Sequence, residues 1–251
     1  MANQPPFAVF LTPVSLPLIT STTETSTFNY FGFVDGSTTI EASKFLAKYS
    51  DGAAKDIEST ITAFMRLTQH DCVGNTEEKK ACWLTIRVTK PNDEFEVTRW
   101  HRDGRMYPYD KGREDVVRSK YAITLLGPST LMLIPSAHTF ATELESYRRF
   151  RWRSSPGSSP PPYTNYEEAD MAAREWLEKK FEKEPRVEAR QDQVIRFSWG
   201  RDDSPLHSEP DLVCDRVFMS VLYGSETEIR EMCEWRESQF GVYDVEEGEE
   251  D

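Results

Sequence analysis

Residues 121–134 have the sequence YAITLLGPSTLMLI, and this stretch decides the fold class of the chain. Two apolar segments, 121–126 and 130–134, lie on either side of the triplet Gly127-Pro128-Ser129. Short apolar runs bounded by Gly and Pro are typical of buried strands joined by a turn. Other runs rich in β-branched and aromatic residues predict further strands at 83–88, 94–100, 193–199 and 215–223.

Three other segments predict helices. Residues 56–69, 167–183 and 225–240 carry apolar side chains at the spacing of an amphipathic helix. Ser225 stands three residues before Glu228, which is the pattern of a capping box at a helix start. We therefore expect a mainly β protein with flanking helices, an α+β fold built as a barrel or a sandwich.

The length of 251 residues, or 29.0 kDa, suits one generous domain, which we expect to span residues 1–243. Residues 153–162 (RSSPGSSPPP) are too rich in Pro and Ser to form a core, and they predict a mobile loop that would suit a lid. Residues 244–251 hold six acidic side chains and no basic one, and they predict a disordered tail.

The formal net charge is −13 and the isoelectric point is about 4.9. This balance argues against binding to nucleic acid or to an anionic membrane, because both need basic patches that neutralise phosphate. No apolar run reaches the roughly 20 residues that a membrane-spanning helix needs. The four cysteines form no CxxC pair and no secretory signal precedes them, so we expect a cytoplasmic protein with reduced thiols.

Two histidines and an aspartate have the pattern of a metal site. His101 and Asp103 end the predicted strand 94–100, and residues two apart on a strand point to the same face. His207, just before the strand at 215–223, is a candidate third ligand. Two imidazoles and one carboxylate on one side of Fe(II) leave three positions open for oxygen chemistry. The alternative is that Asp103 lies in a plain turn and His207 in an ordinary loop.

Arg216 follows on the predicted strand 215–223, and Phe218 and Ser220 share its face. An arginine on an apolar face is costly unless an anion meets it, and a guanidinium binds a carboxylate through two charge-assisted bonds. The alternative is an arginine paired with acidic neighbours at the surface.

The HRD triplet at 101–103, the distal His207 and the nearby Arg216 resemble the motif of the Fe(II)- and 2-oxoglutarate-dependent oxygenases. Members of that family have a double-stranded β-helix, a jelly-roll or cupin-like barrel. The resemblance covers about residues 95–223 and implies an insertion around 138–190. It implies that His101, Asp103 and His207 bind iron, and that Arg216, helped by Ser220, binds 2-oxoglutarate. The implied reaction uses molecular oxygen to oxidise a C–H bond of a small molecule, with release of succinate and carbon dioxide.

The best candidates for contact with the substrate are polar residues around the HRD triplet, namely Arg99, Arg105, Tyr107 and Tyr109. The positive charge of Arg99 and Arg105 would suit a small carboxylate, although a polar rim around any barrel mouth would have the same composition. Residues 111–120 (KGREDVVRSK) predict a solvated loop near the mouth of the site, and we expect His138 to be an ordinary surface or loop histidine.

Two other classes of function remain open at this stage. One is a metal-binding barrel that catalyses a redox-neutral isomerisation or cyclisation. The other is a non-catalytic binding protein that keeps the barrel without the chemistry. The sequence contains no GxSxG and no glycine-rich phosphate loop, which disfavours a serine hydrolase and a nucleotide-dependent enzyme.

Overall fold

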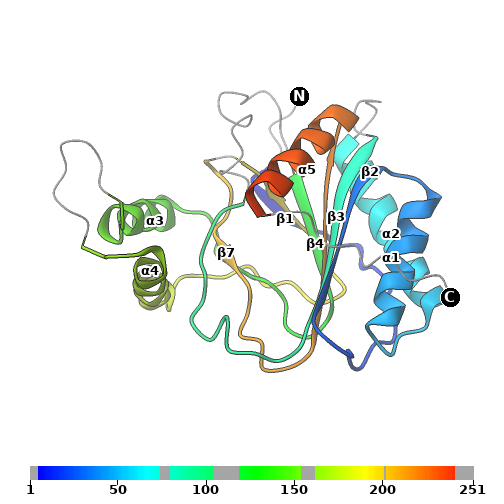
Figure 1. Ribbon diagram of the computed structural model, residues 1–251, viewed down its shortest axis with the longest axis horizontal. Helices are drawn as coiled ribbons and strands as arrows, with labels where there is room; N and C mark the ends of the chain where they lie inside the picture. The colour runs from blue at the N-terminus through cyan, green and yellow to red at the C-terminus, as the bar shows by residue number, and fades with distance from the viewer. Residues whose placement is uncertain (1–4, 74–79, 104–118, 154–161, 201, 241–251) are drawn as a thin grey trace.

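An antiparallel sheet forms the centre of the structure, a computed structural model that describes residues 5–73, 80–103, 119–153, 162–200 and 202–240 (Figure 1). Its strand order is β1-β6-β4-β8-β3-β2, and every neighbouring pair is antiparallel. The strands are β1 (Phe7–Val9), β2 (Ser26–Phe33), β3 (Ala81–Thr89), β4 (Ser119–Leu126), β6 (Ile195–Ser198) and β8 (Arg216–Gly224). Four of them confirm the strands expected at 83–88, 121–126, 193–199 and 215–223.

The side chains of the sheet alternate between two different environments, as the two-residue period of a strand requires. On β8, Val217, Met219, Val221 and Tyr223 belong to the main hydrophobic core. The residues between them, Arg216, Phe218, Ser220 and Leu222, line a cavity on the opposite face. One face of the sheet is therefore a core and the other is the wall of a site.

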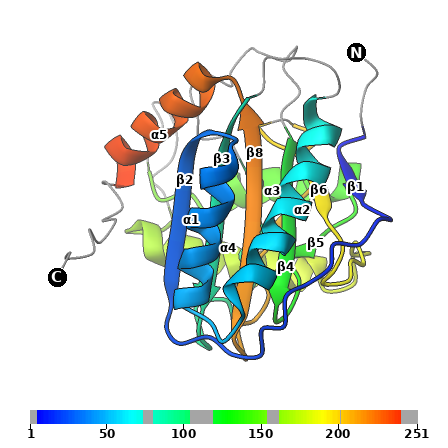
Figure 2. The same ribbon diagram turned by 90° about the vertical axis from the view of Figure 1, so that its right-hand side faces the viewer.

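Helices α1 (Gly36–Lys48) and α2 (Ala54–Val73) cover the core face of the sheet (Figure 2). The predicted helix at 56–69 is confirmed by α2, which buries Ile57, Ile61 and Phe64 completely. Helix α1 is not apparent in the apolar periodicity because half of its buried positions are polar. Its start carries a signal, since the Asp35 side chain accepts hydrogen bonds from the backbone of Ser37 and Thr38.

A second, smaller sheet lies on the side of the cavity face of the larger sheet. It consists of β5 (Leu131–Met132) and β7 (His207–Ser208), with an isolated bridge between His101 and His207 beside it. The predicted strand at 130–134 is thus reduced to two of its residues, Leu131 and Met132. The molecule is a mostly antiparallel sheet with flanking helices, consistent with a β-sandwich.

Among the described residues the expected barrel is not closed, and the strand expected at 94–100 is wrong. Side chains of helix α4 (Tyr166–Phe181), rather than a neighbouring strand, form hydrogen bonds with the backbone groups of that segment. Arg174 donates to the carbonyl oxygens of residues 94 and 97, and the backbone N–H of Thr98 donates to Glu178. Within the described residues, the smaller sheet is therefore too short to form backbone hydrogen bonds with the larger sheet.

Helices α3 (Ala137–Arg149) and α4 form a projecting pair beside β7, within the segment expected as an insertion (Figure 1). Helix α4 confirms the helix predicted at 167–183, and it packs Leu177 and Phe181 against Trp100, Leu133 and Leu206. The loop expected at 153–162 falls almost entirely outside the described residues, and the acidic segment 244–251 lies wholly outside them.

Helix α5 (Glu226–Phe240) confirms the prediction for 225–240, and its capping box is present. The backbone N–H of Ser225 donates to Glu228 at 2.9 Å, and the backbone N–H of Glu228 donates to the Ser225 hydroxyl at 3.2 Å. The helix packs Ile229 and Met232 on Leu222, at the cavity face of the sheet. Among the described helices, none is long and apolar enough to cross a membrane.

Candidate metal centre

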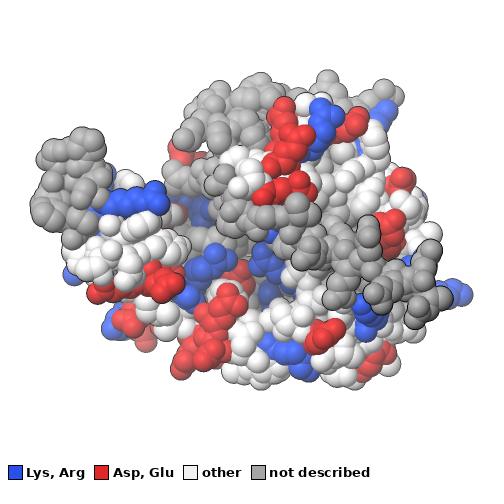
Figure 3. All heavy atoms as spheres, in the orientation of Figure 1, with Lys and Arg blue, Asp and Glu red and all other residues white. Residues whose placement is uncertain are grey.

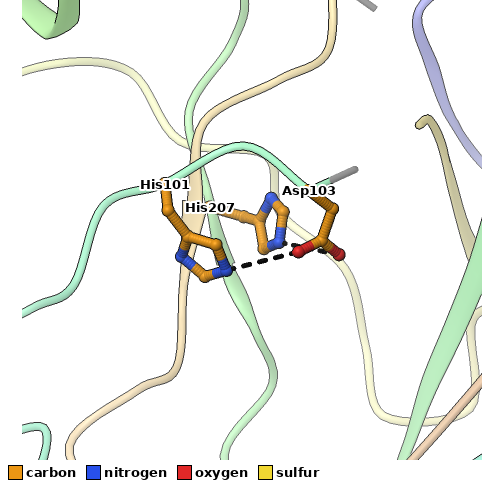
Figure 4. Close-up of side chains that lie close together, drawn as sticks. All are labelled: His101, Asp103 and His207. Carbon is orange, nitrogen blue, oxygen red and sulfur yellow. Dashed lines mark ion pairs between the residues drawn. The ribbon is translucent and has the colours of Figure 1, made fainter. Parts of the chain in front are cut away.

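A backbone bridge brings the two predicted histidine ligands together from distant parts of the chain. The N–H of His101 donates to the carbonyl of His207 at 2.9 Å, and the N–H of His207 donates back to the carbonyl of His101 at the same distance. Asp103 lies two residues further along. One ligand atom from each of the three residues lies within 4.8 Å of the others (Figure 4). The three predicted ligands therefore form one cluster.

The hydrogen bonds of the two rings determine which nitrogen of each faces the aspartate. His101 Nδ1 lies 2.8 Å from the carbonyl oxygen of residue 99, and His207 Nδ1 lies 3.3 Å from the carbonyl oxygen of Pro205. A carbonyl only accepts, so each Nδ1 carries a proton, and the neutral form of each ring presents a lone pair at Nε2. These Nε2 atoms lie 3.4 and 3.5 Å from the two oxygens of Asp103 (Figure 4).

Lone pairs that converge on a carboxylate repel it unless a cation lies among them. A divalent metal ion supplies this charge, and carbonyl oxygens that fix the tautomer of ligating histidines are a regular feature of metal sites. Burial lowers the pKa of His207 despite the nearby carboxylate of Asp103, which favours the neutral, ligating form of the ring. The donor set therefore fits a divalent first-row metal such as Fe(II).

Lys120 adds a positive charge that the sequence analysis did not assign to the site. The predicted solvated loop ended at this residue, but Lys120 lies on β4 and its Nζ is 2.6 Å from Oδ2 of Asp103. Burial opposes ionisation of Asp103, yet the positive charge of Lys120 holds the pKa of its carboxyl well below the usual value. Asp103 is thus an anion, as a metal ligand must be.

A buried ion pair anchors the segment between the first two ligands. The Arg102 guanidinium donates from both Nε and Nη2 to the carboxylate of Glu143 on α3, with a Nε–Oε1 distance of 2.9 Å. The side chains of Arg102 and Glu143 are only 6% and 1% exposed. A third bond runs from Arg102 Nη1 to the carbonyl oxygen of Asp202 at 2.7 Å. No sequence pattern links Glu143 to the HRD triplet, so only the structure identifies it.

Arg216 and Ser220 lie on the cavity face of β8, and both are buried. The guanidinium of Arg216 donates from Nε to the carbonyl oxygen of Pro128 at 2.9 Å and from Nη2 to the Thr130 hydroxyl at 3.0 Å. Burial lowers the pKa of Arg216 to about 10, which leaves the side chain charged at neutral pH. The surface ion pair considered for Arg216 is thus not what the structure contains.

The turn at residues 127–129 holds Arg216 because its backbone passes close to the backbone of residues 215 and 216. Gly127 has φ of 80°, and a Cβ atom placed there would lie 2.4 Å from the carbonyl oxygen of Asp215. Only glycine accommodates both the left-handed conformation and this contact. The Gly-Pro-Ser triplet that predicted a turn therefore also positions the two acceptors of the Arg216 guanidinium.

Among the expected substrate contacts, Arg99 lines the cavity and binds Glu209, with Nη2 at 3.0 and 3.2 Å from the two carboxylate oxygens. Arg105, Tyr107 and Tyr109 fall in 104–118, outside the described residues. His138 begins α3 and its Nε2 lies 3.5 Å from Glu184, so it is not part of the metal cluster.

The cluster opens on a cavity of about 370 Å³. Its described walls carry the cations Arg87, Arg99, Lys120, Arg216 and Arg236 and the carboxylates of Asp103 and Glu209. Figure 3 shows Lys and Arg side chains on both sides of an acidic one near the centre of this face. An acidic protein thus contains a cavity with a surplus of positive charge, which favours anionic ligands.

No family model matches the chain, and no curated protein matches it. Among solved structures, the chain is similar to a "prolyl hydroxylase in complex with hypoxia inducible factor oxygen degradation domain peptide fragment from Trichoplax adhaerens". That similarity covers 81% of this chain and 86% of the other, with 10% sequence identity and a TM-score of 0.33. A score at this level is too low to define a common fold. The chain's own geometry defines a mostly antiparallel sheet protein with a His-Asp-His cluster able to hold a metal.

Proposed function

We propose that the protein is an Fe(II)- and 2-oxoglutarate-dependent oxygenase that oxidises a C–H bond of a small molecule. One observation carries the proposal. The Nε2 atoms of two histidines converge on the carboxylate of Asp103 at the wall of a cavity that also contains the buried, charged side chain of Arg216. A metal site and an anion site in one cavity are what this chemistry needs.

His101, Asp103 and His207 would hold the iron, which leaves its remaining positions open to other ligands. With 2-oxoglutarate and molecular oxygen, the bound iron supplies the oxidising power for C–H cleavage, and succinate and carbon dioxide are released. The chain's own part is to keep Asp103 ionised and both rings in the ligating tautomer. Arg102 and Glu143 would hold the HRD segment still while this occurs.

Arg216 would bind the distal carboxylate of 2-oxoglutarate, because a guanidinium at a buried position is stabilised by an anion. Thr130 orients the guanidinium through Nη2, and Ser220 on the same face of β8 would add a hydroxyl. The positive surplus of the cavity supports a small carboxylate as the substrate. Arg99, Arg105 and Tyr107 remain the predicted substrate contacts, and Arg99 is the one within the described residues.

The decisive experiment separates this proposal from the two alternatives. Anaerobic addition of Fe(II) and 2-oxoglutarate to the full chain should produce a weak visible absorption band, and admission of air should release succinate. A protein that binds metal without releasing succinate would favour a redox-neutral reaction. A protein that binds neither iron nor 2-oxoglutarate would favour a non-catalytic role.

The ligand assignment has its own test with a matched control. His207→Ala should reduce bound iron to the background level, because one of three ligands is lost. His138→Ala should leave the iron content of the protein intact, since this side chain is 61% exposed and outside the cluster. Equal iron content in the two variants would refute the assignment, whichever level both reached.

A further inference from the structure

A row of side chains crosses the cavity face near the middle of the strands, four residues along β8 from Arg216. Asn29 on β2 pairs in register with Thr85 on β3, which pairs with Ser220 on β8. All three residues line the cavity. Asn29 stands two strand spacings from β8, about 10 Å, and its row meets β8 four residues beyond Arg216, about 13 Å along the strand. The Asn29 amide is thus well separated from Arg216, which would bind the distal carboxylate of the cosubstrate.

Two donors determine the orientation of the Asn29 amide. The indole Nε1 of Trp83 and the hydroxyl of Thr85 each donate to Asn29 Oδ1, both at 3.1 Å. The reversed amide would turn its NH₂ group toward the indole N–H of Trp83, which only donates, and would lose that bond. The amide therefore presents its NH₂ group in a defined direction.

The NH₂ group of Asn29 is left without an acceptor. Asn29 Nδ2 is a buried atom with no hydrogen-bond partner among the described residues. An unpaired buried donor costs about 1–3 kcal/mol, so a buried polar group normally has a partner. Because Asn29 lines a cavity, a ligand atom that accepts a hydrogen bond would satisfy Nδ2.

Aromatic side chains determine what kind of molecule could carry that acceptor. The indole of Trp83 stacks on Phe31, with ring centroids 5.1 Å apart and planes inclined by 25°. Trp83 and Trp199 belong to one apolar cluster together with Leu222, and all three line the cavity. A polar donor beside aromatic walls suits a flat group that carries an oxygen acceptor.

We infer that Asn29, oriented by Trp83 and Thr85, forms a subsite that binds the carbonyl-type oxygen of a planar group of the substrate. The inference rests on the proposed function only in naming the occupant as the substrate. A neutral amide or ketone oxygen is sufficient for Nδ2, whereas the cations of the cavity would hold the anionic part of the same molecule.

Benzamide is a suitable probe, since it has a planar ring and a neutral amide oxygen. In the ¹⁵N-labelled full chain, the side-chain NH₂ signals of Asn29 would be assigned by their loss in Asn29→Asp. These signals should shift on titration with benzamide. Asn29→Asp keeps an oxygen facing Trp83 and Thr85 but replaces the donor by an acceptor, so benzamide affinity should fall at least about tenfold.

Asn92→Asp is the matched control, because it makes the same chemical change at an exposed asparagine whose Nδ2 donates to a backbone carbonyl outside the cavity. It should bind benzamide as the wild type does. Should Asn29→Asp fail to fold, Trp83→Phe keeps a ring but removes one of the donors that orient the amide, and its benzamide affinity should fall severalfold. Wild-type protein that does not bind benzamide, or equal affinity in wild type and the Asn29 or Trp83 variant, would overturn the subsite.

Iron and 2-oxoglutarate binding should be measured on the same samples. Loss of benzamide binding with both retained in Asn29→Asp supports the subsite. A wild type that binds benzamide through Asn29 but neither iron nor 2-oxoglutarate would refute the proposed function and leave the subsite standing.

Discussion

Replacement of Glu143 by alanine is expected to destabilise the fold and weaken the metal site together. The change removes the carboxylate that pairs with Arg102, in a contact where the two side chains are 6% and 1% exposed. The guanidinium would keep its bond to the carbonyl oxygen of Asp202 but lose its counter-charge. Loss of one partner of a buried pair costs about 3–5 kcal/mol, because the other charge stays desolvated.

The free energy of unfolding should be measured by denaturant titration of the metal-free protein, followed by circular dichroism. A double variant, Arg102→Met with Glu143→Leu, should recover much of the loss, since neither charge then remains buried. Arg190→Ala, which breaks an exposed pair with Asp192, should leave the unfolding midpoint nearly unchanged.

Metal affinity is the second measurement. Arg102 lies between the proposed ligands His101 and Asp103, so loss of its anchor should weaken metal binding by about 10–100-fold, the range found for groups that orient ligands. Asp71→Ala provides a comparison, because Asp71 pairs with the buried Arg196 at 3.5 Å but neither residue lines the metal cavity. It should lower stability without this loss of affinity. A Glu143→Ala protein destabilised by less than about 1 kcal/mol, as for an exposed pair, would refute the reasoning.

Three other outcomes follow from contacts of the described residues. Arg216→Met should weaken 2-oxoglutarate binding at least about 30-fold, which is the lower end of the range for loss of a buried charged partner. The amount of bound iron should stay unchanged. Equal affinity for 2-oxoglutarate in variant and wild type would contradict the anion site. Gly127→Ala should lower the free energy of unfolding by at least about 1–2 kcal/mol, because φ is 80° and the added Cβ meets a backbone oxygen; an unaltered denaturation curve would count against this turn. Hydrogen bonding from Lys90 lowers the pKa of Asp215, so the folded state gains stability from this carboxylate above its ordinary pKa of 3.8 and loses it as the pH falls below that value. Asp215→Asn should therefore be less stable than wild type at pH 7 and lose less stability on acidification, and parallel stability curves against pH would disagree with the pairing.

Long runs with a clear period were predicted well, because their structure depends on local pattern. The strands β3, β4, β6 and β8 and the helices α2, α4 and α5 all fall where their apolar spacing indicated. The failures have tertiary causes. Residues 94–100 alternate as a strand does, but their backbone groups form hydrogen bonds with the side chains of Arg174 and Glu178 on α4. Helix α1 was missed because its buried face is half polar.

The residues of the candidate site likewise divide into those that the sequence predicts and those that only the structure identifies. The motif spacing of His101 and Asp103, the distal His207 and the inward Arg216 are all visible in the chain itself. The strand expected to place His101 and Asp103 on one face is absent, and the bridge between His101 and His207 brings the residues together instead. Lys120 was assigned to a solvated loop, since its neighbours in sequence are charged. Only the register of β4 in the sheet brings it to Asp103.

By itself, the sequence determined that this is a mainly β protein with flanking helices and a candidate His-Asp-His and arginine site. The tertiary structure alone decided that the described sheets do not close into a barrel, that Glu143 anchors the HRD segment, and that Asn29 keeps an unpaired donor in the cavity. The physical reason is that a pattern along the chain records which face a residue occupies, whereas the partner of a buried polar group comes from a distant segment. Burial makes that partner energetically decisive, and only the folded chain identifies it.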